Sequence, residues 1–276
     1  MHDLVSDLAK FISKQFTLVL EDDCSREIGS KTRHLSYFYT KFHIKKFATF
    51  HEAKRLRTIL ELNFFRDDWY FISRTHYLLP MIRCLRVLIL SHNRHITKLP
   101  DSIGKLIYLR YLDLSTTNIR RLPNSICKLC NLQILNLSNC WFLVAFPRDM
   151  HKLINLLHLD FAETKIMEMP TNLGKLKCLQ TLTKFIVSEH SEYGIEELGK
   201  LTNLRGSLPI FELQNVKSCK DGCLRDVKHL KELVMEWKVD TNASESHIIV
   251  LDSLQPHSNL KASLSKAMAV KVFQTG

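Results

Sequence analysis

Two groups of residues in this 276-residue chain have types and spacings that could do chemistry. The first is the segment 194–200, Gly-Ile-Glu-Glu-Leu-Gly-Lys, which satisfies the GxxxxGK pattern of a phosphate-binding loop. Leu201 follows it, however, where such a loop needs Ser or Thr to hold Mg²⁺, and Glu196 and Glu197 would repel phosphate. We therefore interpret the segment as the helical side of a structural repeat.

The second group consists of cysteines. Cys127 and Cys130 form a CxxC pair, and Cys219 and Cys223 lie roughly 90 residues further on, which is weak evidence for zinc. We interpret all eight cysteines as reduced packing residues. No Ser/His/Asp set, carboxylate pair or metal-binding helix stands out. The sequence thus predicts neither a catalytic nor a metal site.

The elements that would position any functional group follow a repeated pattern between Leu85 and Leu182. An LxxLxL motif recurs at steps of 24, 23, 24 and 23 residues. Its apolar positions are Leu85, Leu88, Leu90; Leu109, Leu112, Leu114; Leu132, Leu135, Leu137; Leu156, Leu159, Phe161; and Leu179, Leu182. Each copy continues with an apolar-Pro pair and a closing apolar pair, namely Leu99-Pro100 with Ile103/Leu106, Leu122-Pro123 with Ile126/Leu129, Phe146-Pro147 with Met150/Leu153, and Met169-Pro170 with Leu173/Leu176. This period predicts an α/β leucine-rich repeat solenoid, with a curved parallel sheet on the concave side and short helices or loops on the convex side.

Alternation along each strand decides which residues are free to bind a partner. The leucines face inward, so the expected protein-interaction surface consists of Val87, Ile89, Ser91, Tyr111, Asp113, Ser115, Ile134, Asn136, Ser138, His158, Asp160 and Ala162. Such a mixture suits a protein ligand, although a passive solvated sheet face would also be mixed. The ninth position of each copy is expected to face the interior and bond the turning backbone; it holds Asn93, Thr117, Cys140 and Thr164.

The chain is basic, with a formal net charge of +11. Thirteen basic and six acidic residues between Leu85 and Leu182 leave +7 in the regular repeats. Such a charge can attract nucleic acid or an anionic membrane. Aromatic residues are not interleaved with the basic ones as a base-stacking platform requires, so we expect no nucleic-acid partner. No apolar run approaches the ~20 residues of a membrane span.

Weaker patterns flank the regular repeats. Residues 1–16 have the apolar spacing of a short helix, and residues 16–20 and 33–37 are expected to form strands. Leu56, Ile59 and Leu62 then mark a degenerate copy, as do irregularly spaced leucines after Leu182.

The repeat pattern ends near residue 261. A copy opened by Leu260 would need apolar residues at positions 263 and 265, where Ser263 and Ser265 stand. We therefore expect residues 262–276 to be a divergent, disordered tail.

Five short motifs share one family likeness. They are Met1-His2-Asp3 with the helix that follows, Lys31 to Ser36, Leu179 to Phe185, Leu204 to Leu208, and Leu230 to Trp237. In this order they resemble plant nucleotide-binding leucine-rich repeat (NB-LRR) disease-resistance proteins of the coiled-coil class, and the resemblance extends from residue 1 to about residue 261.

The resemblance assigns a role to His2. In that family the MHD motif ends the nucleotide-binding module and its His contacts bound ADP, so His2 would be a cofactor-binding residue in an intact parent module, with Asp3 as its structural partner. Here the Met of the motif is residue 1, and the phosphate loop of that module is absent from the chain. We therefore expect no cofactor and no ATPase activity for this chain, with ADP or ATP bound only by a full-length relative.

The resemblance also implies a division of the chain. Residues 1–50 would be the winged-helix end of the nucleotide-binding module plus a linker. Residues 51–261 would be the leucine-rich repeat domain, regular over 85–182 and irregular over 183–261. With the tail at 262–276, we interpret the chain as truncated, through an incomplete gene model, altered splicing or an early stop.

The expected function is protein recognition in plant defence. The chain would be the interaction module of an intracellular, cytoplasmic immune receptor that binds a pathogen effector or a guarded host protein and restrains the nucleotide-binding module. The alternatives are an incomplete ADP/ATP-binding switch protein and a general leucine-rich repeat scaffold. An extracellular receptor is disfavoured, because its repeats would follow NxLxGxIP rather than the xLPxxIGKL found here.

Overall fold

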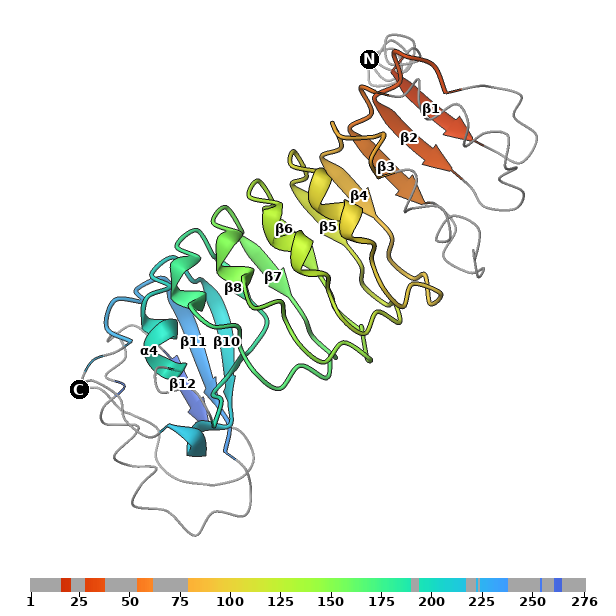
Figure 1. Ribbon diagram of the computed structural model, residues 1–276. Coiled ribbons are helices and arrows are strands. Elements are labelled where there is room, and N and C mark those ends of the chain that lie inside the picture. The colour runs from red at the N-terminus through yellow and green to blue at the C-terminus, as the bar shows by residue number, and fades with distance from the viewer. Residues whose placement is uncertain are drawn as a thin grey trace, which may run out of the picture.

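The protein is a stack of short parallel strands (Figure 1). The computed structural model describes residues 16–20, 28–37, 54–61, 79–189, 194–216, 222, 224–237, 254 and 261–264. Within them, eight strands form one sheet in the order β1 to β8, and four form a second sheet in the order β12-β11-β10-β9. Within each sheet, strands that follow one another in the sequence pair in parallel, so the connection between them is a crossover that runs along the outside of the stack.

The strands of the first sheet fall where the repeats predict them. They are β1 (Thr17–Leu20), β2 (His34–Tyr37), β3 (Thr58–Glu61), β4 (Val87–Ile89), β5 (Tyr111–Asp113), β6 (Ile134–Asn136), β7 (His158–Asp160) and β8 (Thr181–Leu182). Those of the second sheet are β9 (Phe185–Ile186), β10 (Gly206–Phe211), β11 (Leu230–Met235) and β12 (Lys261–Leu264). The solenoid fold predicted from the leucine spacing is confirmed.

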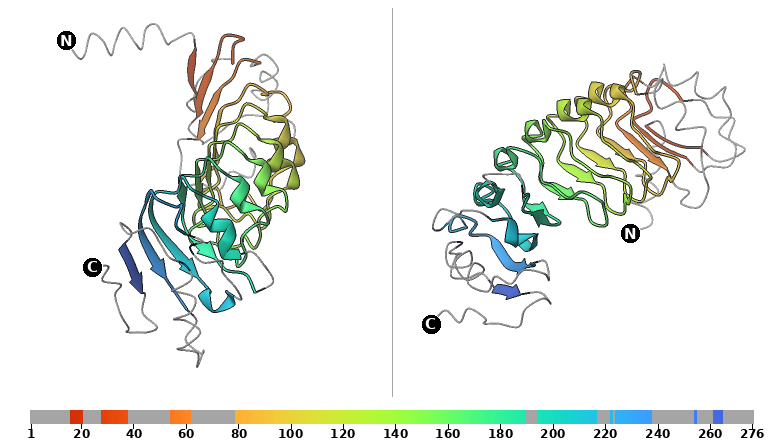
Figure 2. Two further views of the ribbon diagram at one scale, coloured as in Figure 1. Left: turned by 90° about the vertical axis from the view of Figure 1, so that its left-hand side faces the viewer. Right: turned by 60° about the horizontal axis from the view of Figure 1, so that its bottom comes forward.

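Short helices cover the convex side of the stack (Figure 2). Four of them are 3₁₀ helices in successive connections, η2 (Asp101–Lys105), η3 (Asn124–Lys128), η4 (Met150–Lys152) and η5 (Leu173–Lys175), and one is the α-helix α4 (Gly194–Gly199). A further 3₁₀ helix, η6 (Leu213–Asn215), directly follows β10 at the end of that strand. Pro100 and Pro123 precede η2 and η3 with φ of −73° and −68°, the value that a proline ring fixes. No helix in the described part of the chain is long and apolar enough to cross a membrane.

The convex side is crowded, and this crowding helps to curve the stack. Adjacent strands lie about 4.8 Å apart, whereas a helix with its side chains is about 10–12 Å wide. A Cβ atom added to Gly104 in η2 would lie 2.6 Å from the carbonyl oxygen of Ser125 in η3. Neighbouring helices are therefore already at their closest approach, and the helical side spreads further than the strand side.

The core is one continuous column of apolar side chains. All fourteen predicted inward positions of the LxxLxL motifs are buried, none more than 4% exposed. The closing pairs are buried too, from Ile103/Leu106 to Leu173/Leu176. Each leucine packs between the repeats before and after it. A single repeat could therefore not bury these leucines without its neighbours.

The first sheet ends at Leu182 for a reason visible in the sequence. Lys184 stands at the sixth position, which Leu90, Leu114, Leu137 and Phe161 fill in the preceding repeats. Its ammonium lies over the Phe161 ring, 5.4 Å from the centroid, and burial lowers the pKa of Lys184. A charged side chain at a core position cannot continue the column, so the chain starts a second sheet with the buried Phe185 and Ile186.

Two predicted boundaries fall within the sheets. The boundary at residue 51 does not divide the sheet, because β1 and β2 precede it and pair through β3 with the regular repeats. The start of the predicted tail at residue 262 falls within β12, which pairs with β11 and places Ala262 and Leu264 opposite Leu233 and Met235. The predicted N-terminal helix at 1–15, His2 and residues 265–276 lie outside the described residues.

The fold predicts a sharp contrast between neighbouring residues of the sheet. Leu135→Ala should lower the free energy of unfolding by about 2–5 kcal/mol, because it opens a cavity in the core column. His158→Ala, on the opposite side of the sheet, should change it by no more than about 0.5 kcal/mol. Urea denaturation of both variants measures the difference, and equal losses would contradict the inward and outward assignment.

Candidate protein-interaction surface

The strand register arranges the predicted surface residues in three rows that cross the sheet. The first row runs Val87, Tyr111, Ile134, His158 and Thr181, each residue paired with the next. The second row runs Ile89, Asp113, Asn136 and Asp160. The third row follows two residues later with Ser91, Ser115, Ser138 and Ala162. Residues that are 23 or 24 positions apart in the chain therefore become direct neighbours.

The first row is the accessible part of this surface. Val87, Tyr111, Ile134 and His158 are all half-buried, and they place two aliphatic side chains beside an aromatic and an imidazole ring. The row continues towards the N-terminus through Thr58, His34 and Thr17. His158 Nδ1 lies 2.9 Å from Thr181 Oγ1, and His34 Nδ1 lies 3.1 Å from Thr58 Oγ1, so a His–Thr contact recurs in two parts of the row.

The second row has a structural role that the sequence analysis missed. Asp113 Oδ1 accepts a hydrogen bond of 2.9 Å from the Ser115 backbone N–H. Asn136 accepts one from Ser138 and Asp160 one from Ala162, both at 3.0 Å. Each is an Asx turn, in which the side chain closes the backbone two residues later. The signal was the Asp or Asn that ends the strand in three successive repeats.

Asp113 and Ser115 are less accessible than the first row, because they are only 9% and 8% exposed. Besides its bond to Ser115, Asp113 accepts a 3.4 Å hydrogen bond from the Tyr111 hydroxyl. Burial, and then the Asp113 charge, raise the pKa of Tyr111. This Tyr–Asp pair fixes the ring of the first row over the second row, so it presents a pre-oriented aromatic face.

A left-handed residue follows the third row in four successive repeats, three of which contain an Asx turn. His92, Thr116, Asn139 and Glu163 have φ between 53° and 61°, at the same place in four successive repeats. The ninth-position residue comes next and turns inward, as predicted: the Thr117 hydroxyl donates to the Leu114 carbonyl at 2.7 Å, and the Cys140 thiol donates to the same oxygen at 3.0 Å. Thr164 repeats the first bond with Phe161 at 2.9 Å. The concave surface is therefore held in place by side-chain bonds to backbone.

The GxxxxGK segment forms α4 and the residue after it, and its lysine is already engaged. Lys200 Nζ forms a 2.5 Å ion pair with Glu197, whose other carboxylate oxygen accepts a 2.8 Å hydrogen bond from the Gly174 backbone N–H. Leu198 and Leu201 are buried in the core, as their spacing predicts. Glu197 thus joins two repeats at the place where a phosphate loop would hold its ligand.

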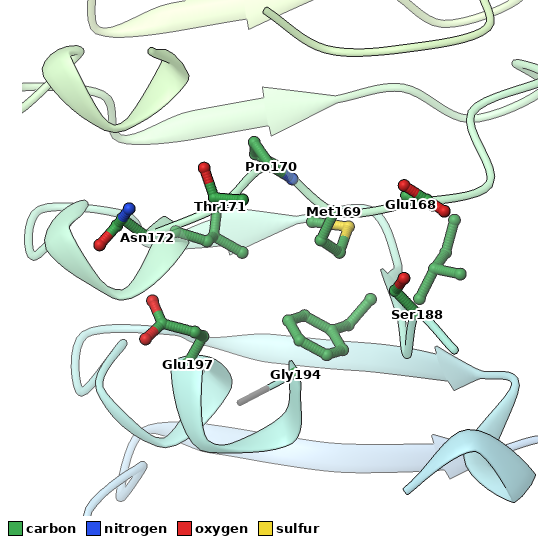
Figure 3. A pocket seen from close by; sticks show the side chains of 11 residues that line it. Glu168, Met169, Pro170, Thr171, Asn172, Ser188, Gly194 and Glu197 are labelled. Atoms are coloured by element: carbon green, nitrogen blue, oxygen red, sulfur yellow. The ribbon is translucent and has the colours of Figure 1, made fainter. Parts of the chain in front are cut away.

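A pocket of about 320 Å³ lies next to this segment, where the first sheet gives way to the second (Figure 3). Figure 3 shows Met169, Thr171 and Asn172 on one side of it and Glu197 on α4 on the other. Its charged lining residues are Glu168 and Glu197, and no Lys or Arg lines it. The electrostatics of the pocket therefore disfavour an anionic ligand.

The cysteines of the CxxC pair do not share an environment. Cys127 is buried in η3, whereas Cys130 is exposed after it. Burial, and then the charge of Asp149, raise the pKa of Cys127 to about 11. Over the residues that the structure describes, no group of three or more His, Cys, Asp or Glu side chains could hold a metal ion. Cys219 and Cys223 lie outside the described residues.

Comparison with known families and proteins gives one consistent result. The family described as a leucine-rich repeat region matches residues 70–273. Disease resistance protein At3g14460 of Arabidopsis thaliana is 44% identical over 95% of this chain and 19% of its own length. Disease resistance RPP13-like protein 1 of the same plant is 39% identical over 95% of this chain and 26% of its own length. The chain thus spans about a fifth to a quarter of the length of these relatives.

Solved structures show the same fold. A leucine-rich repeat protein of Leptospira interrogans, LIC12759, matches with a TM-score of 0.50 and 21% identity, over 88% of this chain and 51% of that one. The plant peptide hormone receptor RGFR1, solved in complex with RGF2, matches with a TM-score of 0.56 and 21% identity, over 80% of this chain and 34% of the receptor.

The Asx turns make a testable claim about Asp160. Asp160→Ala removes the acceptor of both the Ala162 N–H and the Thr183 hydroxyl, which lies 2.7 Å from Oδ1. We expect it to lower the free energy of unfolding by about 1–3 kcal/mol, because two half-buried donors lose a charged acceptor. Asp160→Asn keeps Oδ1 and should lose less. Thermal denaturation of both variants checks this, and an Asn variant as unstable as the Ala variant would contradict the turn bond.

A second prediction concerns thiol reactivity. With a pKa of about 11, only about one Cys127 side chain in a thousand is a thiolate at pH 8. Iodoacetamide at pH 8 should therefore modify the exposed Cys84 and Cys130 well before Cys127 in the folded protein. Mass spectrometry of timed samples measures the order, with a urea-unfolded sample as the control in which all three react alike.

Proposed function

Because the chain belongs to the leucine-rich repeat family and is similar to plant disease-resistance proteins over 95% of its length, we propose that it is the ligand-recognition module of a plant intracellular immune receptor. Its ligand is a protein, either a pathogen effector or a host protein that the receptor guards. The module recognises and carries out no reaction of its own.

The first row of the concave surface supports this proposal most directly. Val87, Tyr111, Ile134 and His158 are contiguous through strand register, half-buried, and of the apolar and aromatic types that anchor protein interfaces. The Asx turns hold the second row beneath them. A partner would therefore meet a surface that is already ordered, and little conformational entropy would be lost on binding.

The same module has a second proposed role, which is to restrain the nucleotide-binding module of a full-length receptor. The observation that favours it is the length of the relatives, of which this chain spans 19% and 26%. Within such a receptor, His2 would contact ADP by resemblance to the MHD motif. In that receptor, ADP or ATP would be bound by the nucleotide-binding module.

We place the protein in the cytoplasm. Among the described residues, Cys84, Cys127, Cys130, Cys140 and Cys178 are free thiols. Free thiols suit a compartment that keeps cysteines reduced. The similarity to disease-resistance proteins points to the same place.

The proposal is tested at the centre of the first row. Ile134→Arg should abolish capture of the protein ligand from infected plant tissue, because it places a charge in the apolar part of the interface. Ile154→Arg is the matched control, since Ile154 is 55% exposed and follows η4 on the helical side. Affinity purification with quantitative mass spectrometry compares the two variants with the unchanged chain.

Both variants must retain the melting temperature of the unchanged chain. A ligand captured by the Ile154→Arg variant and lost with the Ile134→Arg variant supports recognition by the concave surface. A ligand retained by both variants, or lost equally with both, would contradict it.

A further inference from the structure

Four arginines occupy one register position in four successive repeats. Arg33, Arg57, Arg86 and Arg110 directly precede β2, β3, β4 and β5, at the edge of the sheet where the strands begin (Figure 1). Their backbones are joined in order, with N–H to carbonyl distances of 2.7, 2.7 and 2.8 Å between consecutive members. We call this set the arginine column. Parallel strands lie about 4.8 Å apart, so the column carries a positive charge at each such step.

The fold itself does not require arginine at this position. The next three repeats continue the same backbone bonds with Gln133, Leu157 and Gln180. An amide and an aliphatic side chain therefore serve the backbone equally well. The arginines need a reason other than folding, because four neighbouring guanidinium groups repel one another.

A cleft opens beside the first three members of the column. It has a volume of about 380 Å³, and the described residues that line it are Arg33, Arg55, Arg57, Cys84, Arg86 and Tyr108. Four of these six side chains are cationic and none is acidic. The ion pairs of the described residues, Lys152–Asp149 and Lys200–Glu197, lie in other repeats.

The cleft lies at a position where other residues replace an asparagine that links neighbouring repeats further along the chain. Asn131, Asn155 and Asn203 each precede the first leucine of a repeat and donate a hydrogen bond of 2.7–2.8 Å to a carbonyl of the repeat before. The equivalent residues of the earlier repeats are Arg55, Cys84 and Tyr108, all three of which line the cleft. This edge of the solenoid thus carries a cationic cleft in the earlier repeats and asparagine hydrogen bonds between repeats in the later ones.

We propose that this cleft is a binding site for a compact anion that carries several phosphate groups. Guanidinium groups bind phosphate with paired N–H donors, and they keep their charge at any physiological pH. The Arg33 guanidinium is already oriented, with its carbon 4.6 Å from the centroid of the Phe16 ring. The volume is that of a small-ligand site, for which about 300–1,000 Å³ is usual.

The arrangement selects both the charge and the size of the ligand. The backbones of Arg33 and Arg86 lie two strand steps apart, about 10 Å, so the arginines of the cleft start from separate points and favour a ligand with several phosphate groups over a single phosphate. A nucleic-acid strand or a long acidic peptide would need the positive track to continue, but Gln133 and Leu157 follow Arg110. A short ligand with several phosphates matches the cleft in both respects.

The experiment uses inorganic tripolyphosphate as the probe, with the whole chain studied by isothermal titration calorimetry at constant ionic strength. Tripolyphosphate should bind at least tenfold more tightly than orthophosphate or citrate. Arg57→Gln should weaken its binding at least tenfold, and Arg86→Gln should do the same. Arg57→Lys, which keeps the charge but loses the paired donors, should weaken it by a smaller factor.

Two controls separate the cleft from general basicity. Arg110→Gln changes the column outside the cleft. Arg121→Gln changes an exposed arginine whose backbone forms an isolated parallel β-bridge with that of Lys98, outside the named strands. Both should bind tripolyphosphate within twofold of the unchanged chain. Glutamine already occupies this position at Gln133 and Gln180, so the Arg57 and Arg110 variants should keep the melting temperature.

Three results would overturn the proposal. They are citrate binding equal to tripolyphosphate binding, a loss with Arg110→Gln as large as with Arg57→Gln, and an absence of tripolyphosphate binding at millimolar concentration. The second would instead indicate an acidic polypeptide along the whole column. None of these results bears on ligand recognition by the first row, so the two proposals can fail separately.

Discussion

The structure depends on one constraint, which is that no single repeat can bury its own leucines. The strands β4 to β7 are three residues long. In each of them only the middle residue points into the core. Leu112, Leu135 and Leu159 are buried because they align across β5, β6 and β7. The apolar contacts therefore add up along the stack, and stability is a property shared by neighbouring repeats. The packing of these leucines also fixes where the surface residues of each strand lie.

The surface residues repeat with the same period as the core leucines, but the fold constrains some surface positions more than others. The Asx turns and the left-handed residues after them commit Asp113, Asn136 and Asp160 to the backbone. The first row makes side-chain contacts such as that between Tyr111 and Asp113, but no such bond to the backbone turns, so its residue types are less constrained by the fold. In each of the three-residue strands β5 to β7, the first position is therefore available to a partner, whereas the third position stabilises the turn that follows.

The edge where the strands begin follows the same logic. In the later repeats, asparagines at this edge close the seam between repeats, as Asn131 and Asn155 do. In the earlier repeats, Arg55, Cys84 and Tyr108 stand in the place of these asparagines, and together with three arginines of the column they line a cleft. The concave rows and the cationic cleft are therefore different surfaces of one scaffold, one apolar and suited to a protein, the other charged and suited to a small anion.

The leucine spacing alone determined the fold, the inward residues and the parallel order, because each follows from a period that the chain repeats. The sixth-position Lys184 was also in the sequence, but its effect on the sheet came from its contact with Phe161 in the preceding repeat. Only the tertiary structure decided that Asp113 and Ser115 are buried, that β1 and β2 join the sheet, and that four arginines line one cleft. The physical reason is register: residues that are 23–29 positions apart meet only when the strands align, and local pattern does not specify what each side chain then touches.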